Sequence, residues 1–153
     1  MKPITDFAAH FGTKIALNAD FIVKKDNRYF LLNPNLKMVI RTDFYYAGVY
    51  LGKFKNGIFF PSFNLLAMLA RVETNKIIVD KKTAWLFICG RDVFRMGILT
   101  VRGSLRKGDY TLVLNEFGEC LGFGKITRRL DEEKARVVMR NILDIGDFLR
   151  REV

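Results

Sequence analysis

The sequence is poor in the residues that carry most catalysis and metal binding. Its 153 residues include one histidine and two cysteines. Acid–base and nucleophilic catalysis need a proton carrier or an activated nucleophile held against partner groups, and structural zinc needs clustered Cys and His ligands. The acidic run Asp131-Glu132-Glu133 lies between two predicted strands and is interpreted as a charged turn rather than a divalent-cation site. The sequence therefore predicts no catalytic residue, no metal site and no cofactor.

The few residues of these types that do occur favour packing over chemistry. Cys89 and Cys120 each lie in an apolar stretch, without Cys-x-x-Cys spacing and without a nearby histidine. They are predicted to be buried, small hydrophobic residues in a reducing compartment. His10 lies beside Phe11 on the apolar side of a predicted helix, which favours a packed core histidine over a catalyst. A Cys–His pair stays open as an alternative on sequence alone.

The sequence also lacks a long apolar run. A membrane span needs about 18 consecutive apolar residues, and no stretch approaches that length. Met1-Lys2-Pro3 is not followed by an apolar segment of signal-peptide length. We therefore expect a soluble, intracellular protein with no membrane partner.

The strongest compositional feature that is present is positive charge. The 26 Lys and Arg residues outnumber the 16 Asp and Glu residues, which gives a net charge of +10 that both halves of the chain share. Each phosphate neutralised by a cation releases condensed counterions, so a positive field built into folded domains favours binding to nucleic acid. A surface made basic for solubility is the alternative. An anionic membrane surface is a weaker third option, because no long basic amphipathic helix is evident.

The first half of the chain is predicted to fold into helices and β-hairpins. Half of all residues are hydrophobic and 14 are Phe, so a folded protein with a large core is expected. Asp26-Asn27 and Asn56-Gly57 are typical of tight hairpin turns, and Ser62 is a good helix cap. The elements expected here are a helix over 5–11 capped by Thr5, a hairpin over 21–25 and 28–32, a strand over 37–41, a hairpin over 45–55 and 58–60, and a helix over 63–71.

The second half is predicted to consist mainly of short strands separated by turns that contain glycine or charged residues. The pattern changes after Glu73-Thr74-Asn75, and we place a domain boundary there, between residues 1–75 and residues 76–153. The elements expected in the second domain are strands near 76–80, 84–88, 98–102, 110–115, 120–128 and 135–142, a short helix near 91–96, and an ordered segment over 145–149. The overall prediction is an α+β protein, with a mixed α/β domain followed by a small β-barrel.

The candidate RNA contacts are basic residues that lie mostly beside turns of the second domain. Arginine forks bind phosphate with two hydrogen bonds and stack on bases, so arginine is favoured over lysine at such positions. For any single residue, a solvated surface charge is an equally good interpretation; the group is stronger, because a small barrel can bring distant residues to one rim. The candidates are Arg91, Arg95, Arg102, Lys125, Arg128, Arg140, Arg150 and Arg151.

The spacing of these turns resembles a known RNA-binding module, the PUA domain. The resemblance is carried by Gly90-Arg91-Asp92-Val93, Gly97, Gly108-Asp109, Gly122-Phe123-Gly124 and the ending Asp144 to Arg151. Adding Leu51-Gly52-Lys53-Phe54, the amphipathic element 59–69 and Leu121-Gly122-Phe123-Gly124 makes the chain similar to the nuclear-import-protein-seven family, which assists assembly of the large ribosomal subunit. The similarity covers residues 45–153 well and the first 40 residues weakly.

The resemblance implies a non-enzymatic protein with an N-terminal α/β domain and a C-terminal PUA domain that binds ribosomal RNA precursors. It implies an RNA surface formed by the first helix of the PUA domain, the next strand and the final strand, which maps onto Arg91 to Arg95, Ile98 to Arg102, Arg140 and Arg150-Arg151. The N-terminal domain is expected to dock ribosome assembly proteins. An archaeal, cytoplasmic protein is expected, or a nucleolar one in a eukaryote.

The leading hypothesis is therefore an RNA-binding factor for pre-rRNA processing and large-subunit assembly that recognises single-stranded or irregular RNA. Two alternatives stay open. The first is an RNA-modifying enzyme or its accessory subunit, although no catalytic motif is evident. The second is a protein-interaction adaptor whose positive charge serves only solubility.

Overall fold

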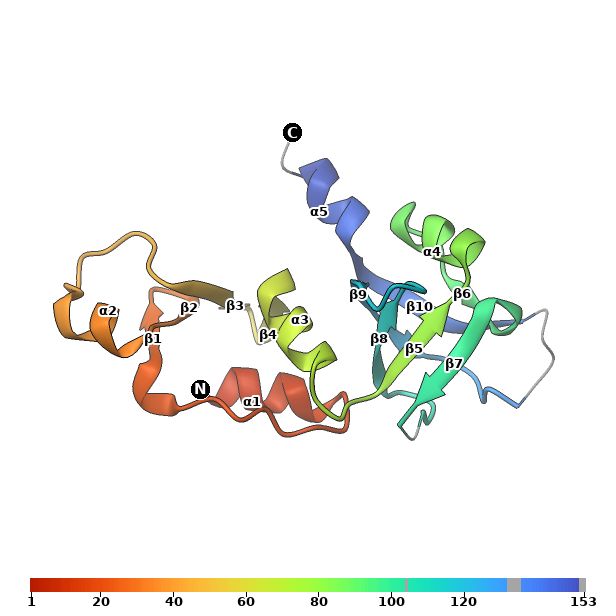
Figure 1. Ribbon diagram of the computed structural model, residues 1–153, viewed down its shortest axis with the longest axis horizontal. Helices are drawn as coiled ribbons and strands as arrows, with labels where there is room; N and C mark the ends of the chain where they lie inside the picture. The colour runs from red at the N-terminus through yellow and green to blue at the C-terminus, as the bar shows by residue number, and fades with distance from the viewer. Residues whose placement is uncertain (104, 132–135, 152–153) are drawn as a thin grey trace.

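Two β-sheets of different size, bridged by helices, make up an elongated molecule (Figure 1). This computed structural model describes residues 1–103, 105–131 and 136–151. The smaller sheet has four antiparallel strands in the order β1-β2-β3-β4. The N-terminal elements are α1 (Lys2–Ala9), the 3-10 turn η1 (Ala19–Phe21), β1 (Ile22–Lys25), β2 (Arg28–Leu31), α2 (Pro34–Val39), β3 (Val49–Lys55), β4 (Ile58–Pro61) and α3 (Phe63–Ala70).

The larger sheet has six strands in the order β6-β10-β9-β8-β5-β7 and is curled. Every neighbouring pair is antiparallel except β5 and β8, which run parallel. Its elements are β5 (Lys76–Val79), α4 (Lys81–Ile88), β6 (Val93–Phe94), the 3-10 turn η2 (Arg95–Gly97), β7 (Ile98–Arg102), β8 (Tyr110–Leu114), β9 (Cys120–Ile126), β10 (Val137–Asp144) and α5 (Ile145–Arg151). The predicted α+β architecture is confirmed.

Both predicted hairpins of the smaller sheet are present, as is the helix after Ser62. Asp26 and Asn56 adopt positive φ angles of 55° and 53°, as tight hairpin turns require. The Ser62 hydroxyl accepts a hydrogen bond from the Leu65 amide at 3.1 Å, so the predicted cap of α3 is confirmed.

Two details of the N-terminal half differ from the prediction. The strand predicted over 37–41 is wrong, because the Asn33 side chain caps a helix, α2, by accepting from the Leu36 amide at 2.7 Å. α1 begins at Lys2 and not after Thr5, because Pro3 is well suited to a first turn. Thr5 is not a cap, and its hydroxyl donates to the Met1 carbonyl at 3.2 Å.

Two details of the larger sheet also differ. The strand predicted over 84–88 is wrong: these residues belong to α4, which Asp80 caps by accepting from the Thr83 amide at 2.7 Å. Ala84 and Phe87 are buried at helical spacing. The short helix predicted near 91–96 is likewise replaced by β6 and the η2 turn, because β6 pairs with β10. The first helix of this half therefore lies about ten residues earlier than expected.

One hydrophobic core joins the two sheets. Leu112, Leu114 and Phe123 lie on the outer face of the curled sheet and pack in the same cluster as residues of α1 and α3. The Phe7 ring of α1 lies 5.5 Å from the Phe123 ring. A second cluster, which includes Phe87, fills the inside of the curl. Each face of the larger sheet is thus covered by its own core.

Two of the three residues of the predicted boundary segment, Thr74 and Asn75, are buried, whereas Glu73 is exposed. The Thr74 hydroxyl donates to the Phe11 carbonyl at 3.2 Å, and the Asn75 backbone amide donates to the same carbonyl at 2.9 Å. The Asn75 carbonyl accepts from the Leu112 amide at 3.0 Å and so begins the pairing of β5 with β8. The division into residues 1–75 and 76–153 stays a prediction, because α1 and α3 complete the outer face of the larger sheet.

We expect Phe7→Ala to lower the free energy of unfolding by about 3–5 kcal/mol, because it leaves a cavity in the hydrophobic core that joins the two sheets. Phe7 is buried and its ring contacts Phe11, Phe59 and Phe123. Chemical denaturation measures the change. The matched control is Phe117→Ala, whose side chain is 87% exposed and should cost little. Equal losses for the two variants would contradict a shared core.

Candidate nucleic-acid interface

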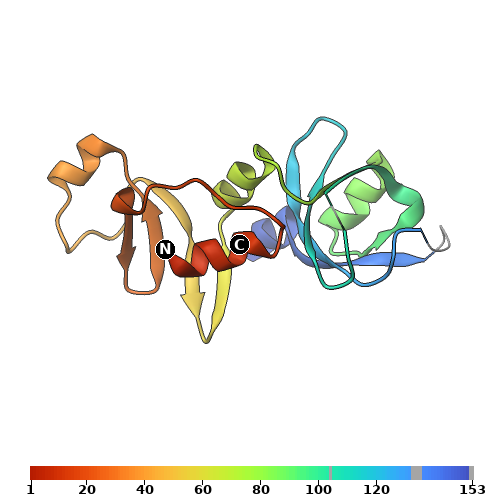
Figure 2. The same cartoon turned by 90° about the horizontal axis from the view of Figure 1, so that it is seen from below.

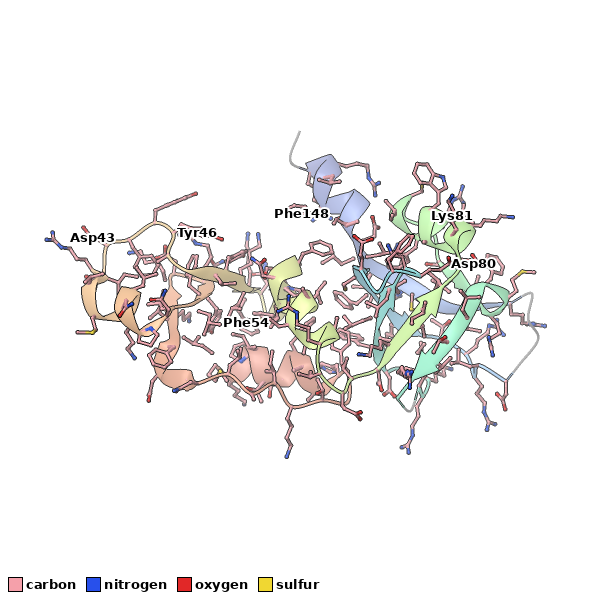
Figure 3. All side chains as sticks on the ribbon, viewed as in Figure 1. Asp43, Tyr46, Phe54, Asp80, Lys81 and Phe148 are labelled. Atoms are coloured by element: carbon pink, nitrogen blue, oxygen red, sulfur yellow. The ribbon has the colours of Figure 1, made fainter. Side chains whose placement is uncertain are left out.

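The first feature of the candidate interface is the exposed side of α4. Because Asp80 caps this helix, Lys81 and Lys82 lie in its first turn (Figure 3). Trp85 follows Lys81 by four residues, so the two side chains share one stripe of the helix. Trp85 is the only tryptophan of the chain and is 67% exposed. An exposed indole beside lysines provides a stacking surface next to positive charge.

A hydrogen-bond network fixes the C-terminal end of α4 to β10. The Asn141 side-chain amide donates to the Phe87 carbonyl at 2.9 Å, to the Arg91 carbonyl at 3.3 Å and to the Asp144 carboxylate at 3.2 Å. The Asn141 backbone amide donates to the Asp92 carboxylate at 2.9 Å. The loop that carries Arg91 is therefore held in place, while the Arg91 side chain itself is exposed.

α5 joins the same network through Arg150. One Arg150 Nη donates to the Ile88 carbonyl of α4 at 3.2 Å, and the other lies 3.5 Å from the Asp144 carboxylate. Asp144 also caps α5 by accepting from the Asp147 amide at 2.7 Å. Gly146 is required here, because a Cβ would collide with the Ile88 carbonyl. We call Lys81, Lys82, Trp85, Arg91 and Arg150 the α4–α5 corner.

A second group lies on the outer face of the curled sheet. In the strand register Tyr110 of β8 pairs with Lys125 of β9, and Lys125 pairs with Arg140 of β10. Directly paired residues project to the same face of a sheet. We call these three residues the outer row. The prediction that His10 is a core residue is wrong: it follows the last turn of α1, is exposed, and its ring lies 4.9 Å from the Tyr110 ring.

The remaining predicted contacts lie elsewhere. Arg128 lines a surface depression of about 660 Å³ together with Lys107 and Arg129. Arg95 donates to the carbonyls of Leu130 and Ile98, at 2.6 and 3.5 Å, and so connects loops of the barrel.

Two further predicted contacts, Arg102 and Arg151, have other surroundings. Arg102 is the last residue of β7, an edge strand of the curled sheet, and pairs with Lys76 of β5. Arg151 pairs with Asp147 on α5 at 3.1 Å. The eight predicted residues thus occupy several places, with Arg91 and Arg150 together at one and Lys125 and Arg140 together at another.

Sequence reasoning missed Trp85, Lys81 and Lys82. It assigned residues 84–88 to a strand on the basis of their apolar character. The signal that could have predicted the helix is Asp80, because aspartate is a preferred N-cap residue. Its carboxylate accepts from the backbone amide three positions later, that of Thr83.

The cysteines differ from the prediction. Cys89 is exposed, and Cys120 is half-buried, so neither is a fully buried core residue. Burial raises the pKa of the Cys120 thiol to about 11, which disfavours the nucleophilic thiolate.

Within the described residues, no three His, Cys, Asp or Glu side chains are close enough to hold a metal ion. Glu132 and Glu133 of the predicted acidic turn lie outside those residues. The helices described are all too short or too polar to cross a membrane.

The curled six-stranded sheet with α4 and α5 defines a PUA-domain protein, and the PUA fold is associated with RNA binding. The family model of the UPF0113 PUA domain matches residues 75–153, which is half of the chain, and the protein belongs to this family. The PUA domain expected from the sequence is thereby confirmed.

Relatives agree with this assignment. A UPF0113 protein from Archaeoglobus fulgidus is 29% identical over 71% of this chain, and the match spans 63% of that protein. A conserved PUA domain protein from Thermoplasma acidophilum has the same fold over 99% of this chain and 92% of its own, with a TM-score of 0.63 and 22% identity. A PUA domain from Aeropyrum pernix covers 61% of this chain and 56% of its own, with a TM-score of 0.52 and 21% identity.

We expect Asp144→Ala to lower the free energy of unfolding by about 2 kcal/mol, because α5 loses its cap and the Asn141 side chain loses a charged partner. Thermal or chemical denaturation measures this. Asp147→Ala is the matched control, since it removes a partly exposed ion pair with Arg151 and should cost under about 1 kcal/mol. A smaller loss for Asp144→Ala than for the control would show that the network does not hold α5.

Thiol labelling should distinguish the two cysteines. At pH 8 the exposed Cys89 should react quickly with a disulfide reagent. Cys120 should react far more slowly, because with a pKa of about 11 only roughly one thiol in a thousand is ionised. Raising the pH toward 11 should speed the slow phase, and unfolding in denaturant should remove it. Two equally fast thiols in the native protein would contradict this structure.

Proposed function

We propose that the protein is a non-enzymatic RNA-binding factor that acts in pre-rRNA processing and assembly of the large ribosomal subunit. The supporting observations are its PUA domain and net charge of +10, together with its resemblance to the nuclear-import-protein-seven family. The RNA is single-stranded or irregular, because a base must be unpaired to stack on a protein side chain.

The α4–α5 corner is the observation that carries this proposal. Trp85 offers an exposed ring to a base, and base–aromatic stacking is worth about 1–3 kcal/mol. Lys81, Lys82 and Arg91 supply mobile charges for the flanking phosphates. Arg150 is anchored by the Ile88 carbonyl and Asp144, and its guanidinium has five N–H donors, so some stay free for a phosphate.

The proposed protein partners are ribosome assembly proteins that dock on the N-terminal half. The support is a group of exposed apolar side chains at the end of the molecule away from the PUA domain (Figure 1), which includes Met38, Val39 and Tyr45. Exposed apolar patches of this kind are typical of protein contacts. The relatives that match over most of their length come from archaea, and we propose an archaeal, cytoplasmic protein.

We expect an oligouridine to quench the fluorescence of Trp85 as it binds. Trp85→Ala should weaken binding about tenfold or more, as measured by filter binding. Lys81→Gln/Lys82→Gln should weaken it and reduce the salt dependence, whereas the charge-matched control Lys14→Gln/Lys37→Gln should not. For a site that neutralises three or four phosphates, affinity should fall roughly 20- to 50-fold between about 50 and 200 mM salt.

Binding that is insensitive to salt, or unchanged in Trp85→Ala, would contradict the site. The ribosomal role is tested separately by crosslinking the protein to RNA in cells and sequencing the attached fragments. Precursors of large-subunit rRNA should be enriched over mature transcripts of other classes. Incubation of the pure protein with RNA should yield no modified nucleoside, and a new nucleoside would favour the enzyme alternative.

A further inference from the structure

A groove of about 1280 Å³ runs between the two halves of the molecule and belongs to neither the α4–α5 corner nor the surface depression near Arg128. One wall is the β3–β4 hairpin, which projects from the body in Figure 2. α1 and the start of α3 also line the groove. The opposite wall is the outer face of the curled sheet, at Tyr110, Phe123 and Ile142, together with α5.

The hairpin wall alternates cations with exposed apolar groups on one face. Lys53 pairs with Phe60 across the two strands, and Lys55 pairs with Ile58, so these four side chains share that face. Phe60 is 43% exposed, Ile58 is 57% exposed, and the Lys53 ammonium lies 5.8 Å from the centre of the Phe60 ring. In the part of the chain that the structure describes, neither lysine has a carboxylate partner.

The opposite wall also combines aromatic rings with cations. Phe148 of α5 is 47% exposed, lines the groove and packs its ring 5.6 Å from the Phe63 ring of α3 (Figure 3). Arg151, one turn further along α5, lies at the same rim. Tyr110 is both a groove residue and the end of the outer row. The row continues the groove wall toward Lys125 and Arg140, so cations lie on both sides of an aromatic channel.

We propose that this groove binds a second segment of single-stranded RNA, so that the β3–β4 hairpin is part of the RNA-binding surface. Single-stranded nucleic acid is bound by positively charged channels in which aromatic rings stack on successive bases. Lys53, Lys55, Arg151 and the outer row provide the charge, and Phe60 and Phe148 provide exposed rings. The inference rests on the proposed RNA-binding function and extends it beyond the PUA domain.

Charge favours RNA over a protein segment as the occupant. The groove is lined by two acidic residues, Asp6 and Asp147, and Asp147 is already paired with Arg151. Apart from that pair, the lining has Lys53 and Lys55 against Asp6, so the groove keeps a net positive charge, which suits a polyanion. α5 connects the groove with the α4–α5 corner, because Arg150 contacts α4 whereas Phe148 and Arg151 line the groove.

The test compares oligouridines of about 5 and about 15 nucleotides, a range that spans the site sizes of small single-strand binding domains. The longer RNA should bind more tightly because it reaches both places. Lys53→Gln/Lys55→Gln should weaken binding of the longer RNA about tenfold, since two phosphate contacts are lost. It should leave the shorter RNA unaffected. The control Lys14→Gln/Lys37→Gln removes the same charge from residues outside the groove and should change neither affinity.

A second pair of variants tests the aromatic part. Phe60→Ala should weaken binding of the longer RNA roughly five- to tenfold, whereas Phe117→Ala, an exposed phenylalanine on the turn before β9, should not. Both side chains are exposed, so both variants should fold, and thermal melting checks this. Photocrosslinking of a 4-thiouridine RNA to the wild-type protein should label peptides that contain residues 53–60.

The outcomes separate this inference from the proposed function. If the longer RNA binds no tighter than the shorter, or the groove variants match their controls, the groove proposal is wrong while the corner stands. If neither RNA binds the wild-type protein, the proposed function itself fails. If the groove variants retain full RNA affinity and instead lose copurifying assembly proteins, the groove docks protein and the RNA proposal is overturned.

Discussion

The packing of α1 against the outer face of the PUA sheet is the constraint on which the rest of the molecule depends. Phe7 and Phe11 lie against Phe123 and Tyr110 with ring centres 5.5–6.3 Å apart. These rings would otherwise be exposed to water from both sides of the joint, so burial of their area holds the small sheet and the large sheet together. The position of the β3–β4 hairpin relative to α5 follows from this one core.

The C-terminal helix shows how a short element can serve two surfaces. Asp144 caps it, Asn141 orients Asp144, and Arg150 anchors the helix to the end of α4. Arg150 is paired with Asp144, and Arg151 is paired with Asp147. Both guanidinium groups are still partly exposed, so each keeps N–H donors that a phosphate could reach. The ion pairs do mean that the arginine side chains are positioned by the fold, as is Lys53 of β3, whose ammonium lies over the Phe60 ring.

The sequence predicted the hairpins, the capped helix α3 and most strands of the PUA domain, because Asn-Gly turns, a Ser cap and short Val- and Ile-rich runs are local signals. It failed at α4, where a fully apolar run has no clear period and the cap at Asp80 lies outside it. For the site, it named Arg91, Arg140 and Arg150. It could not show that the Asn141 side chain holds the loop that carries Arg91, or that Arg95 donates to the carbonyls of Leu130 and Ile98. Which cations share a surface depends on pairings between strands remote in the chain, and no local pattern records them.

The buried junction at Thr74 and Asn75 has a mechanical consequence. A flexible linker would let the two lobes sample many separations, whereas here the junction is hydrogen-bonded to α1 and to β8 and lies between two cores. The junction therefore sets the separation between the hairpin tip and α4 through buried contacts and not through a free linker. A chain that contacts both lobes at once must therefore bridge that distance itself, because the buried junction sets the separation of the lobes.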